Sequence, residues 1–599
     1  MIVIAACLLL LLSGASVGVF LWFGRSLLLP VAEKNEEVTP GKEPVSTEVI
    51  KDSGPAAQPQ PEVDTWDRRV PFPRRALLIS VHNYLFANPV GAGLPTQGSR
   101  KISGLPDKLN TGLRIPFNQI VHLSDVAPAG HARPPLKPVI EKTLSSFLDS
   151  SRPQDRVMVF FIGHAVESAD GVYLVPMEGE LDKPETLLSL KTVYDKLAAC
   201  SARQKVLVMD VCRLNPVVGA ERPGGEAMGQ KLAETLATPP PGVQVWSACG
   251  AEQHSYETED EVMGVFLDKL QTSLERASEG KLKLQEHIQK PDDLIPLDRL
   301  SETVNELIAK QLQPLKLKQI SHLTGRPPDS GASFDAKEPQ PPAPTVAAAP
   351  PPLPAKYQAE LRELLADIAV PPIKHGSPDD GLDFRVLPPF SPARLEAYAG
   401  KADGDSELRT AVRKTQILLY AVSGTQPPPK LAKEVKDVAK TLKSNLTVVR
   451  EGYRKRAEND LKNQIMRDER AVAPILARLG EAYEDLKAAG EKRDAEPKRW
   501  QANYDFMLAR LEGQLAYVWE YQSMLGQIRR EVPALEEGHG GWKLAATPTL
   551  SGDSNGKKLA SSSRKLLDKI IKEHGGTPWE VVAKREQLTA LGLEWKSAK

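Results

Sequence analysis

Two short apolar runs, each followed by a reactive side chain, place the strongest constraint on the fold of this chain. The first covers 157–162 and is followed by His164, and the second covers 206–209 and leads to Cys212. Both runs are rich in β-branched and aromatic residues, which is typical of strands buried on both faces of a parallel sheet. Open α/β sheets build their sites just past the carboxyl ends of such strands. The two reactive residues are therefore expected at one edge of a sheet.

Cysteine and histidine together are the residues that thiol catalysis requires. A free thiol has a pKa of about 8.5 and is mostly protonated at neutral pH. An imidazole beside it can take the proton or, once charged, stabilise the thiolate. Cys212 follows His164 by 48 residues, which leaves room for one crossover helix between adjacent strands. We therefore predict a catalytic dyad of His164 and Cys212.

Taken singly, each residue has a simpler interpretation, as a buried structural thiol or a loop histidine, because free cysteine is among the most buried residue types. The catalytic interpretation rests on their joint placement. Attack on an amide carbonyl also needs an oxyanion hole. The backbone N–H groups of Cys212 and Ala165 are the predicted donors, since both follow strand ends.

The pattern around these runs, from 67 to 335, alternates between strands and helices. Such alternation predicts an α/β fold with a mostly parallel sheet flanked by helices. The further predicted strands are 75–81, 119–123 and 243–249, and the predicted helices are 138–148, 184–199, 227–236 and 297–313.

Five stretches in this region follow one another as motifs. They are ALLISVHNY at 76–84, FFIGHA at 160–165, DGVYLVP at 170–176, VMDVCR at 208–213, and WSAC at 246–249 with SYE at 255–257 and GVF at 264–266. In this order they resemble a caspase-like cysteine peptidase domain, of the group that includes metacaspases and bacterial caspase homologues. The resemblance implies a dyad of His164 and Cys212, endopeptidase activity on a peptide or protein substrate, and no metal or organic cofactor.

The resemblance also bears on substrate binding. In metacaspase-like members the aspartate two before the cysteine faces the first specificity pocket, and Asp210 matches it. This implies cleavage after Arg or Lys, with Tyr256 as a second substrate-binding residue. Asp210 has an alternative role as a structural carboxylate bonded to loop groups. Ala165 and Arg213 depart from the family glycine and its more common histidine, so a catalytically inactive caspase-fold scaffold acting in protein assembly stays the alternative.

The N-terminal segment is apolar. Residues 2–23 carry no charge, and crossing a bilayer takes roughly 20 apolar residues. No basic residue precedes this run, as a signal peptide would require. We therefore predict a transmembrane anchor at 1–24 and a disordered, Pro- and Glu-rich stalk at 25–66. The basic residues after the anchor favour a single-pass membrane protein with a cytoplasmic body.

The second half follows a Pro-rich linker at 336–356. Region 357–540 is expected to be an all-α helical bundle or a dimerising coiled coil, the site of self-association or of a protein partner. Residues 541–599 are expected to form a small helical module. The predicted heptad seam consists of Tyr504, Leu508, Leu511, Leu515, Val518, Gln522 and Leu525.

Charge and cysteine content exclude some functions. The 77 Lys and Arg residues equal the 77 Asp and Glu residues, which argues against a general nucleic-acid binder. The four cysteines form no metal-ligand spacing and no disulfide framework. We therefore expect no nucleic acid and no metal, and a reducing compartment.

Overall fold

The computed structural model describes part of the chain, all of it within the second of two compact units, 1–62 and 63–599. The described ranges are 74–91, 104–113, 115–126, 133–258, 263–278, 297–325, 355–374, 387–388, 390–398, 405–442 and 444–598. The predicted anchor, the stalk and nearly all of the linker lie outside them. No helix within these ranges has the length and hydropathy needed to cross a membrane.

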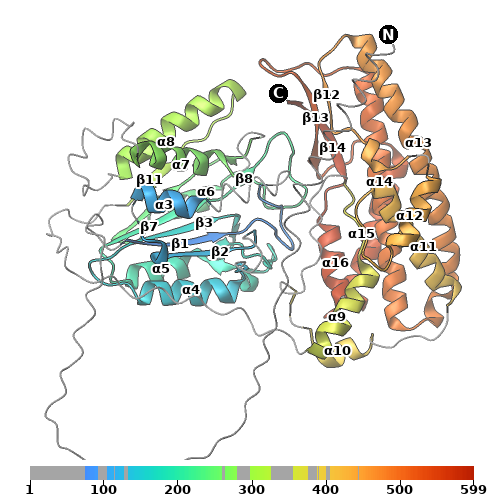
Figure 1. The fold of residues 1–599 in the computed structure, drawn as a ribbon, viewed down its shortest axis with the longest axis horizontal. Coiled ribbons are helices and arrows are strands. Elements are labelled where there is room, and N and C mark those ends of the chain that lie inside the picture. Colours follow the sequence, from blue (N-terminus) through green and yellow to red (C-terminus); the bar gives the residue numbers. More distant parts are fainter. Residues whose placement is uncertain are drawn as a thin grey trace, which may run out of the picture. The chain divides into compact units, whose positions relative to one another are not determined.

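The N-terminal half contains a six-stranded sheet (Figure 1). Five strands are parallel and the edge strand β11 is antiparallel. The predicted strands and the mostly parallel sheet are thereby confirmed. In spatial order the strands are β11 (His322–Thr324), β9 (Val243–Ser247), β7 (Gln204–Asp210), β3 (Arg156–Ile162), β1 (Arg74–Ser80) and β2 (Ile120–Ser124).

Helices cover both faces of this sheet because alternate strand residues point to opposite sides. On β3, Val159 and Phe161 face one core cluster, while Phe160 and Ile162 face another. The first cluster is closed by α4 (Lys137–Asp149), α5 (Leu190–Ala199) and α6 (Gln230–Ala237). The second is closed by α3 (Leu105–Leu113), α7 (Val265–Ser278) and α8 (Leu297–Leu312).

Two small sheets lie at the carboxyl end of the large one. The hairpin of β4 (Ala165–Ser168) and β5 (Gly171–Leu174) begins directly after His164, and β6 (Leu188–Ser189) pairs with β5. β8 (Arg213–Leu214) begins directly after Cys212 and pairs with β10 (Ser255–Tyr256). Both sheets fix the direction in which the chain leaves the site.

The C-terminal half is a helical bundle around α14 (Lys498–Arg530), which is buried on nearly all sides. Six of the seven predicted seam residues are buried, and Gln522 is half-buried. They lie in one core cluster with residues of the other helices, so the seam packs within the chain. The surrounding helices are α9 (Ala355–Ile368), α10 (Pro392–Glu396), α11 (Glu407–Ser423), α12 (Ala432–Thr441), α13 (Glu458–Ala489), α15 (Ser554–Glu573) and α16 (Pro578–Gln587).

The expectation of an all-α second half is corrected by a small antiparallel sheet. β13 (Gly541–Thr547) lies between β12 (Gly452–Arg454) and β14 (Gly592–Ala598). β12 is only three residues long, and the partners of β13 lie about ninety residues before it and fifty after it, so local periodicity carries little signal for them. The sheet also joins the predicted regions 357–540 and 541–599.

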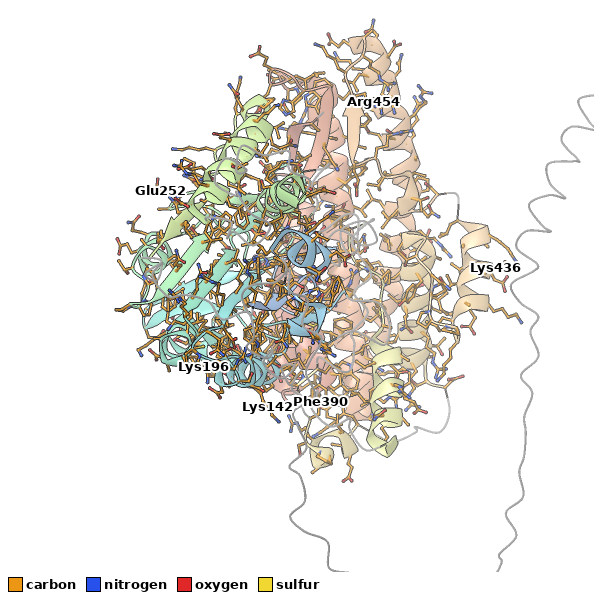
Figure 2. All side chains as sticks on the ribbon, turned by 60° about the vertical axis from the view of Figure 1, so that its left-hand side comes forward. Lys142, Lys196, Glu252, Phe390, Lys436 and Arg454 are labelled. Carbon is orange, nitrogen blue, oxygen red and sulfur yellow. The ribbon has the colours of Figure 1, made fainter. Side chains whose placement is uncertain are left out.

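Most charged side chains lie at the surface of both halves. Lys142 on α4 and Lys436 on α12 are exposed (Figure 2). Most large apolar side chains are buried, and Phe117 and Ile320 are the exposed exceptions among the described residues. The two halves are not independent, because Leu85 and Phe86 from the loop after β1 belong to a core cluster built mainly by α9, α14, α15 and α16.

Candidate active site

His164 and Cys212 follow neighbouring strands, as the sequence predicts. Ile162 at the end of β3 is in register with Asp210 at the end of β7, and the Gly163 N–H donates to the Asp210 carbonyl at 3.1 Å. Glu226 acts electrostatically on both His164 and Cys212. The parallel sheet therefore brings the two residues to the same edge. Their catalytic roles stay a prediction at this point.

The His164 ring is held in one orientation. It is fully buried, its backbone N–H donates to Tyr84 Oη at 2.8 Å, and its Nε2 lies 2.6 Å from the Asn88 carbonyl oxygen. Burial lowers the pKa of His164 to about 4, so the ring is neutral at pH 7. Because a carbonyl oxygen only accepts, the proton of the neutral ring sits on Nε2. Nδ1, which has no partner among the described residues, is then the basic nitrogen.

Cys212 sits at a strained turn. Its φ is 60°, in the left-handed region that non-glycine residues seldom adopt and that is enriched at functional sites. The side chain is 4% exposed. Burial raises the pKa of Cys212 to about 12, with further contributions from the negative charges of Glu226, Glu167 and Asp210. Thiol and imidazole are therefore both neutral at pH 7 in this state.

The two predicted oxyanion donors are not used by the sheets around them. Val175 N–H donates to the His164 carbonyl, so Ala165 and Leu174 form a non-hydrogen-bonded pair of the β4–β5 ladder. The ladder therefore leaves the Ala165 N–H free. The Cys212 carbonyl accepts from Ser255, whereas no backbone group in the described ranges accepts the Cys212 N–H. The oxyanion role of both N–H groups remains a prediction.

Asp210 belongs to a buried charged network. It is fully buried, accepts from Ser255 Oγ at 2.6 Å and pairs with Arg213 at 3.3 Å. Arg213 also pairs with Glu257 at 2.9 Å. Burial raises the pKa values of Asp210 and Glu257, and the Arg213 guanidinium opposes that shift. This geometry matches the structural role that the sequence left open for Asp210. Its role in substrate binding remains untested.

Tyr256 is half-buried on β10, and its N–H donates to Gln319 Oε1 at 2.9 Å. Its ring lies beside that of His254, with 5.7 Å between the centroids. It lies on the strand beside β8, which begins directly after Cys212. Cys249, by contrast, is fully buried in the core.

Three residues of the site were not assigned from the sequence. Tyr84 and Asn88 lie on the loop after β1, and Tyr84 ended the first motif without a role. Its hydroxyl would lie 2.1 Å from a Cβ at position 163, so the glycine before His164 is sterically required. Glu226 lies in a Gly- and Pro-rich stretch with no pattern, so only the fold could reveal its position.

One group of residues in the described ranges has the composition of a metal site. Donor atoms of Asp505, Glu573 and His574 lie within 4.8 Å of one another in the helical half. Both carboxylates, however, already bind Arg493, and Asp505 also binds Lys569. His574 caps α15 and bonds to Tyr398, a capping and packing role that makes metal binding here unnecessary.

The fold and the site together define an α/β protein with a cysteine and a histidine at the ends of adjacent parallel strands. No protein-family model matches the chain, and no curated protein matches it. Among solved structures it is similar to the Drosophila initiator caspase Dronc, with 12% identity, a TM-score of 0.27, and coverage of 48% of this chain and 93% of that chain. It is also similar to caspase-1 from Spodoptera frugiperda, with 12% identity, a TM-score of 0.27, and coverage of 46% and 93%.

Proposed function

We propose that the chain is a cysteine endopeptidase that hydrolyses a peptide or protein substrate with Cys212 and His164. The observation that carries the proposal is the register of β3 and β7, which places a histidine and a strained cysteine at the same sheet edge. Thiol catalysis needs this pair and no metal or organic cofactor.

The chemistry follows from the two side chains. His164 Nδ1 takes the thiol proton as Cys212 Sγ attacks the substrate carbonyl carbon. The N–H groups of Cys212 and Ala165 stabilise the resulting oxyanion. His164 then gives the proton to the leaving amine, and water hydrolyses the thioester to release the acid and regenerate the thiol. Tyr84 and Asn88 keep the imidazole ring and its tautomer in place during these steps.

The finer parts of the proposal concern specificity and location. A preference for Arg or Lys before the scissile bond would require the Asp210 carboxylate to face substrate after exchanging its contact with Arg213. The apolar segment at 2–23 supports a membrane anchor, and the basic residues that follow it favour a cytoplasmic body. Alkaline extraction of membranes tests the anchor: the full chain should stay in the pellet, and a chain lacking residues 1–24 should not.

The central test is hydrolysis of a fluorogenic peptide library that varies the residue before the scissile bond. The full chain is compared with Cys212→Ala, His164→Ala and the surface control Lys440→Ala. We expect the first two variants to lose hydrolysis by at least a thousandfold and the control to retain it, because only the first two residues react with substrate. Hydrolysis that persists in Cys212→Ala at the rate of the unmodified chain would exclude the dyad.

The second candidate is an inactive caspase-fold scaffold. The neutral thiol, the neutral imidazole and the 4% exposure of Cys212 favour it, since they describe a site without a thiolate. The two proposals differ in one measurable property. In a scaffold, peptides are not hydrolysed even when Cys212 has become accessible to an alkylating reagent.

A further inference from the structure

We infer that the C-terminal half regulates the site by holding closed the two loops that cover it, an inference that rests on the proposed peptidase function. The nucleophile loop is 215–225, directly after Cys212 and β8. The histidine loop is 82–91, directly after β1. Each loop contacts the dyad on one side and the C-terminal half on the other.

The nucleophile loop is bound to the C-terminal half by polar contacts. Gly219 pairs with Ala546 of β13, whose N–H donates to the Val218 carbonyl at 2.8 Å. The Glu221 carbonyl accepts from the Ala590 N–H at 2.8 Å. The loop thus extends the small sheet along the part of β13 that lies beyond its three-residue pairing with β12. Edge addition of this kind needs only backbone groups.

An ion pair supports the same contact. Lys374 Nζ lies 3.2 Å from Glu221 Oε1, and the two side chains are only 15% and 16% exposed. Partial burial strengthens such a pair relative to one on the open surface. A Cβ at Gly219 would lie 2.4 Å from the Ala546 carbonyl oxygen, so the loop and β13 touch along the backbone.

The histidine loop is bound by apolar contacts instead. Leu85 and Phe86 are 5% and 4% exposed, in the core cluster that contains Phe506 of α14 and Trp579 of α16. The same loop supplies the Asn88 carbonyl that bonds His164. The C-terminal half therefore fixes the position of the histidine through the loop that orients it.

The two loops are joined to each other over the site. Asn88 Oδ1 accepts from the N–H groups of Glu221 and Arg222, and the Asn88 N–H donates to the Pro223 carbonyl. A Cβ at Gly224 would lie 3.3 Å from His164 Cδ2, so the nucleophile loop lies against the imidazole ring. This contact and the burial of Cys212 restrict the access of substrate to the dyad.

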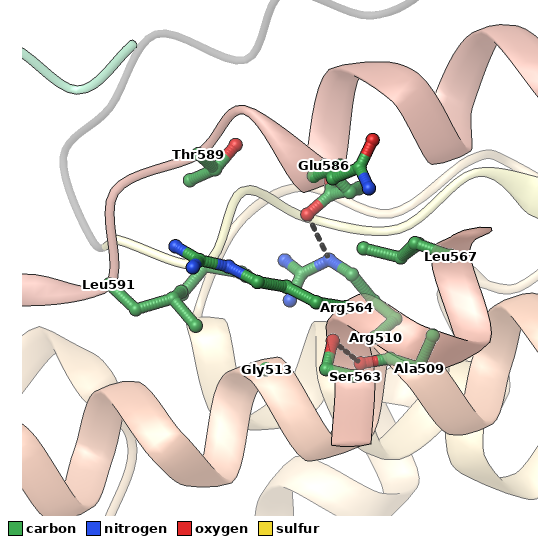
Figure 3. A pocket seen from close by; sticks show the side chains of 11 residues that line it. Ala509, Arg510, Gly513, Ser563, Arg564, Leu567, Glu586, Thr589 and Leu591 are labelled. Atoms are coloured by element: carbon green, nitrogen blue, oxygen red, sulfur yellow. Dashed lines mark hydrogen bonds and ion pairs between the residues drawn. The ribbon is translucent and has the colours of Figure 1, made fainter. Parts of the chain in front are cut away.

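The contact is tied to the interior of the bundle. Arg510 of α14, which is buried, bonds the Pro371 carbonyl three residues before Lys374 and lies 3.5 Å from Glu586. Figure 3 shows this pair beside a cavity of about 10 Å³ that Thr589 and Leu591, the neighbours of Ala590, also line. The cavity has room for about one water molecule. Lys374 and Ala590, which both contact Glu221, thus belong to two segments that the buried Arg510 holds together.

The two kinds of contact predict which loop moves. The nucleophile loop is held by a few hydrogen bonds and one ion pair, which can separate without exposing a core. The histidine loop is held by buried apolar side chains. Release therefore frees the loop that covers the site while the loop that orients His164 stays in place.

The experiment measures alkylation of Cys212 by iodoacetamide in the full chain, with mass spectrometry reporting Cys200 and Cys249 in the same sample. Two variants weaken the contact: Lys374→Glu, which places like charges together, and Ala546→Pro, which removes the N–H donated to Val218. Lys440→Glu, at an exposed ion pair on α12, is the matched charge control. We expect Cys212 to react at least tenfold faster in both variants than in the unmodified chain. In the control, Cys212 should react at the rate of the unmodified chain.

Reversing the ion pair distinguishes release from unfolding. The variant Lys374→Glu with Glu221→Lys should return Cys212 to the slow rate of the unmodified chain. Buried Cys200 and Cys249 should stay slow throughout, since global unfolding would accelerate all three cysteines. An unchanged Cys212 rate in both variants, or equal acceleration of all three cysteines, would overturn the inference.

The peptidase assay on the same variants separates this inference from the proposed function. Faster alkylation of Cys212 together with faster Cys212-dependent hydrolysis supports both proposals. Faster alkylation without any hydrolysis supports the closing contact and excludes the peptidase. Hydrolysis by the unmodified chain at the rate of the released variants overturns the closing contact and keeps the peptidase.

Discussion

At the scale of the residue, the site is defined by backbone geometry as much as by its reactive atoms. Cys212 holds a left-handed backbone, and Gly163 passes under the Tyr84 hydroxyl so that the His164 N–H reaches it. These features cost free energy, and they are retained where they position a functional group. The Asn88 carbonyl accepts from Nε2 of His164 and so fixes the tautomer in which Nδ1 is the base.

Replacing Gly163 with alanine tests this geometry. The new Cβ would meet the Tyr84 oxygen at 2.1 Å, so we expect destabilisation of about 1–3 kcal/mol and slower hydrolysis. The free energy of unfolding measured in urea reports the first effect. Adding Tyr84→Phe removes the oxygen and should recover part of the stability. Losses that simply add in the double variant would contradict the contact.

The pH dependence of Cys212 alkylation tests its buried, protonated state. Only the thiolate reacts, and its fraction rises tenfold per pH unit below the pKa. With a pKa of about 12, the rate in the unmodified chain should rise linearly on a logarithmic scale from pH 7 to pH 10. A plateau near pH 8 would show a thiolate already stabilised and would contradict the closed neutral pair.

At the scale of the element, α14 organises the C-terminal half. Its heptad pattern predicted a seam, and the structure confirms that the seam is buried. The same pattern could not say what covers it, since a neighbouring helix of the chain and a second copy offer the same apolar surface. Here α11, α13 and α15 pack on α14. Self-association through this region remains a prediction.

Truncating the seam should therefore destabilise the chain itself. Leu511 is fully buried, and Leu511→Ala is expected to cost about 2–5 kcal/mol of the free energy of unfolding of the helical half. Chemical denaturation followed by circular dichroism measures the loss. The surface variant Lys440→Ala should change it by less than about 0.5 kcal/mol. A neutral Leu511→Ala would show that the seam is not packed within the chain.

At the scale of the whole molecule, the two halves share a core cluster and meet at the loops that cover the dyad. Access to the N-terminal half is therefore coupled to the C-terminal half. The buried titratable groups of both halves also act together, because their pKa shifts make the stability of the fold depend on pH.

The buried histidines should destabilise the fold as the pH drops from about 6.5 to 4. Burial lowers the pKa values of His82, His122 and His164 to about 3, 4 and 4, so the unfolded chain, with histidines near about 6.5, takes up protons first. Burial raises the pKa values of Asp125 and Glu178 to about 6 and 7. These two carboxyls oppose the effect of the histidines, since they bind protons more tightly in the folded chain.

Burial also lowers the pKa values of His254 and His574 and raises those of Asp210, Glu257 and Glu512. Thermal unfolding between pH 7 and pH 4 therefore compares the unmodified chain with a variant that lacks one buried histidine. The variant His122→Gln removes one of the buried histidines and should flatten the decline. A decline in His122→Gln as steep as that in the unmodified chain would contradict a neutral buried His122.

The sequence by itself determined the parallel sheet, the strand ends that carry His164 and Cys212, and the helical character of the second half. Each of these follows from local periodicity, which hydrophobic burial imposes on every strand and helix. The tertiary structure decided which residues contact one another. It determined the ion pair of Asp210 with Arg213, the position of Glu226 beside the dyad, the sheet of β12, β13 and β14, and the contact of Ala546 with the nucleophile loop. These are pairings between distant segments through single side chains or backbone groups, and such contacts leave no periodic pattern in the sequence.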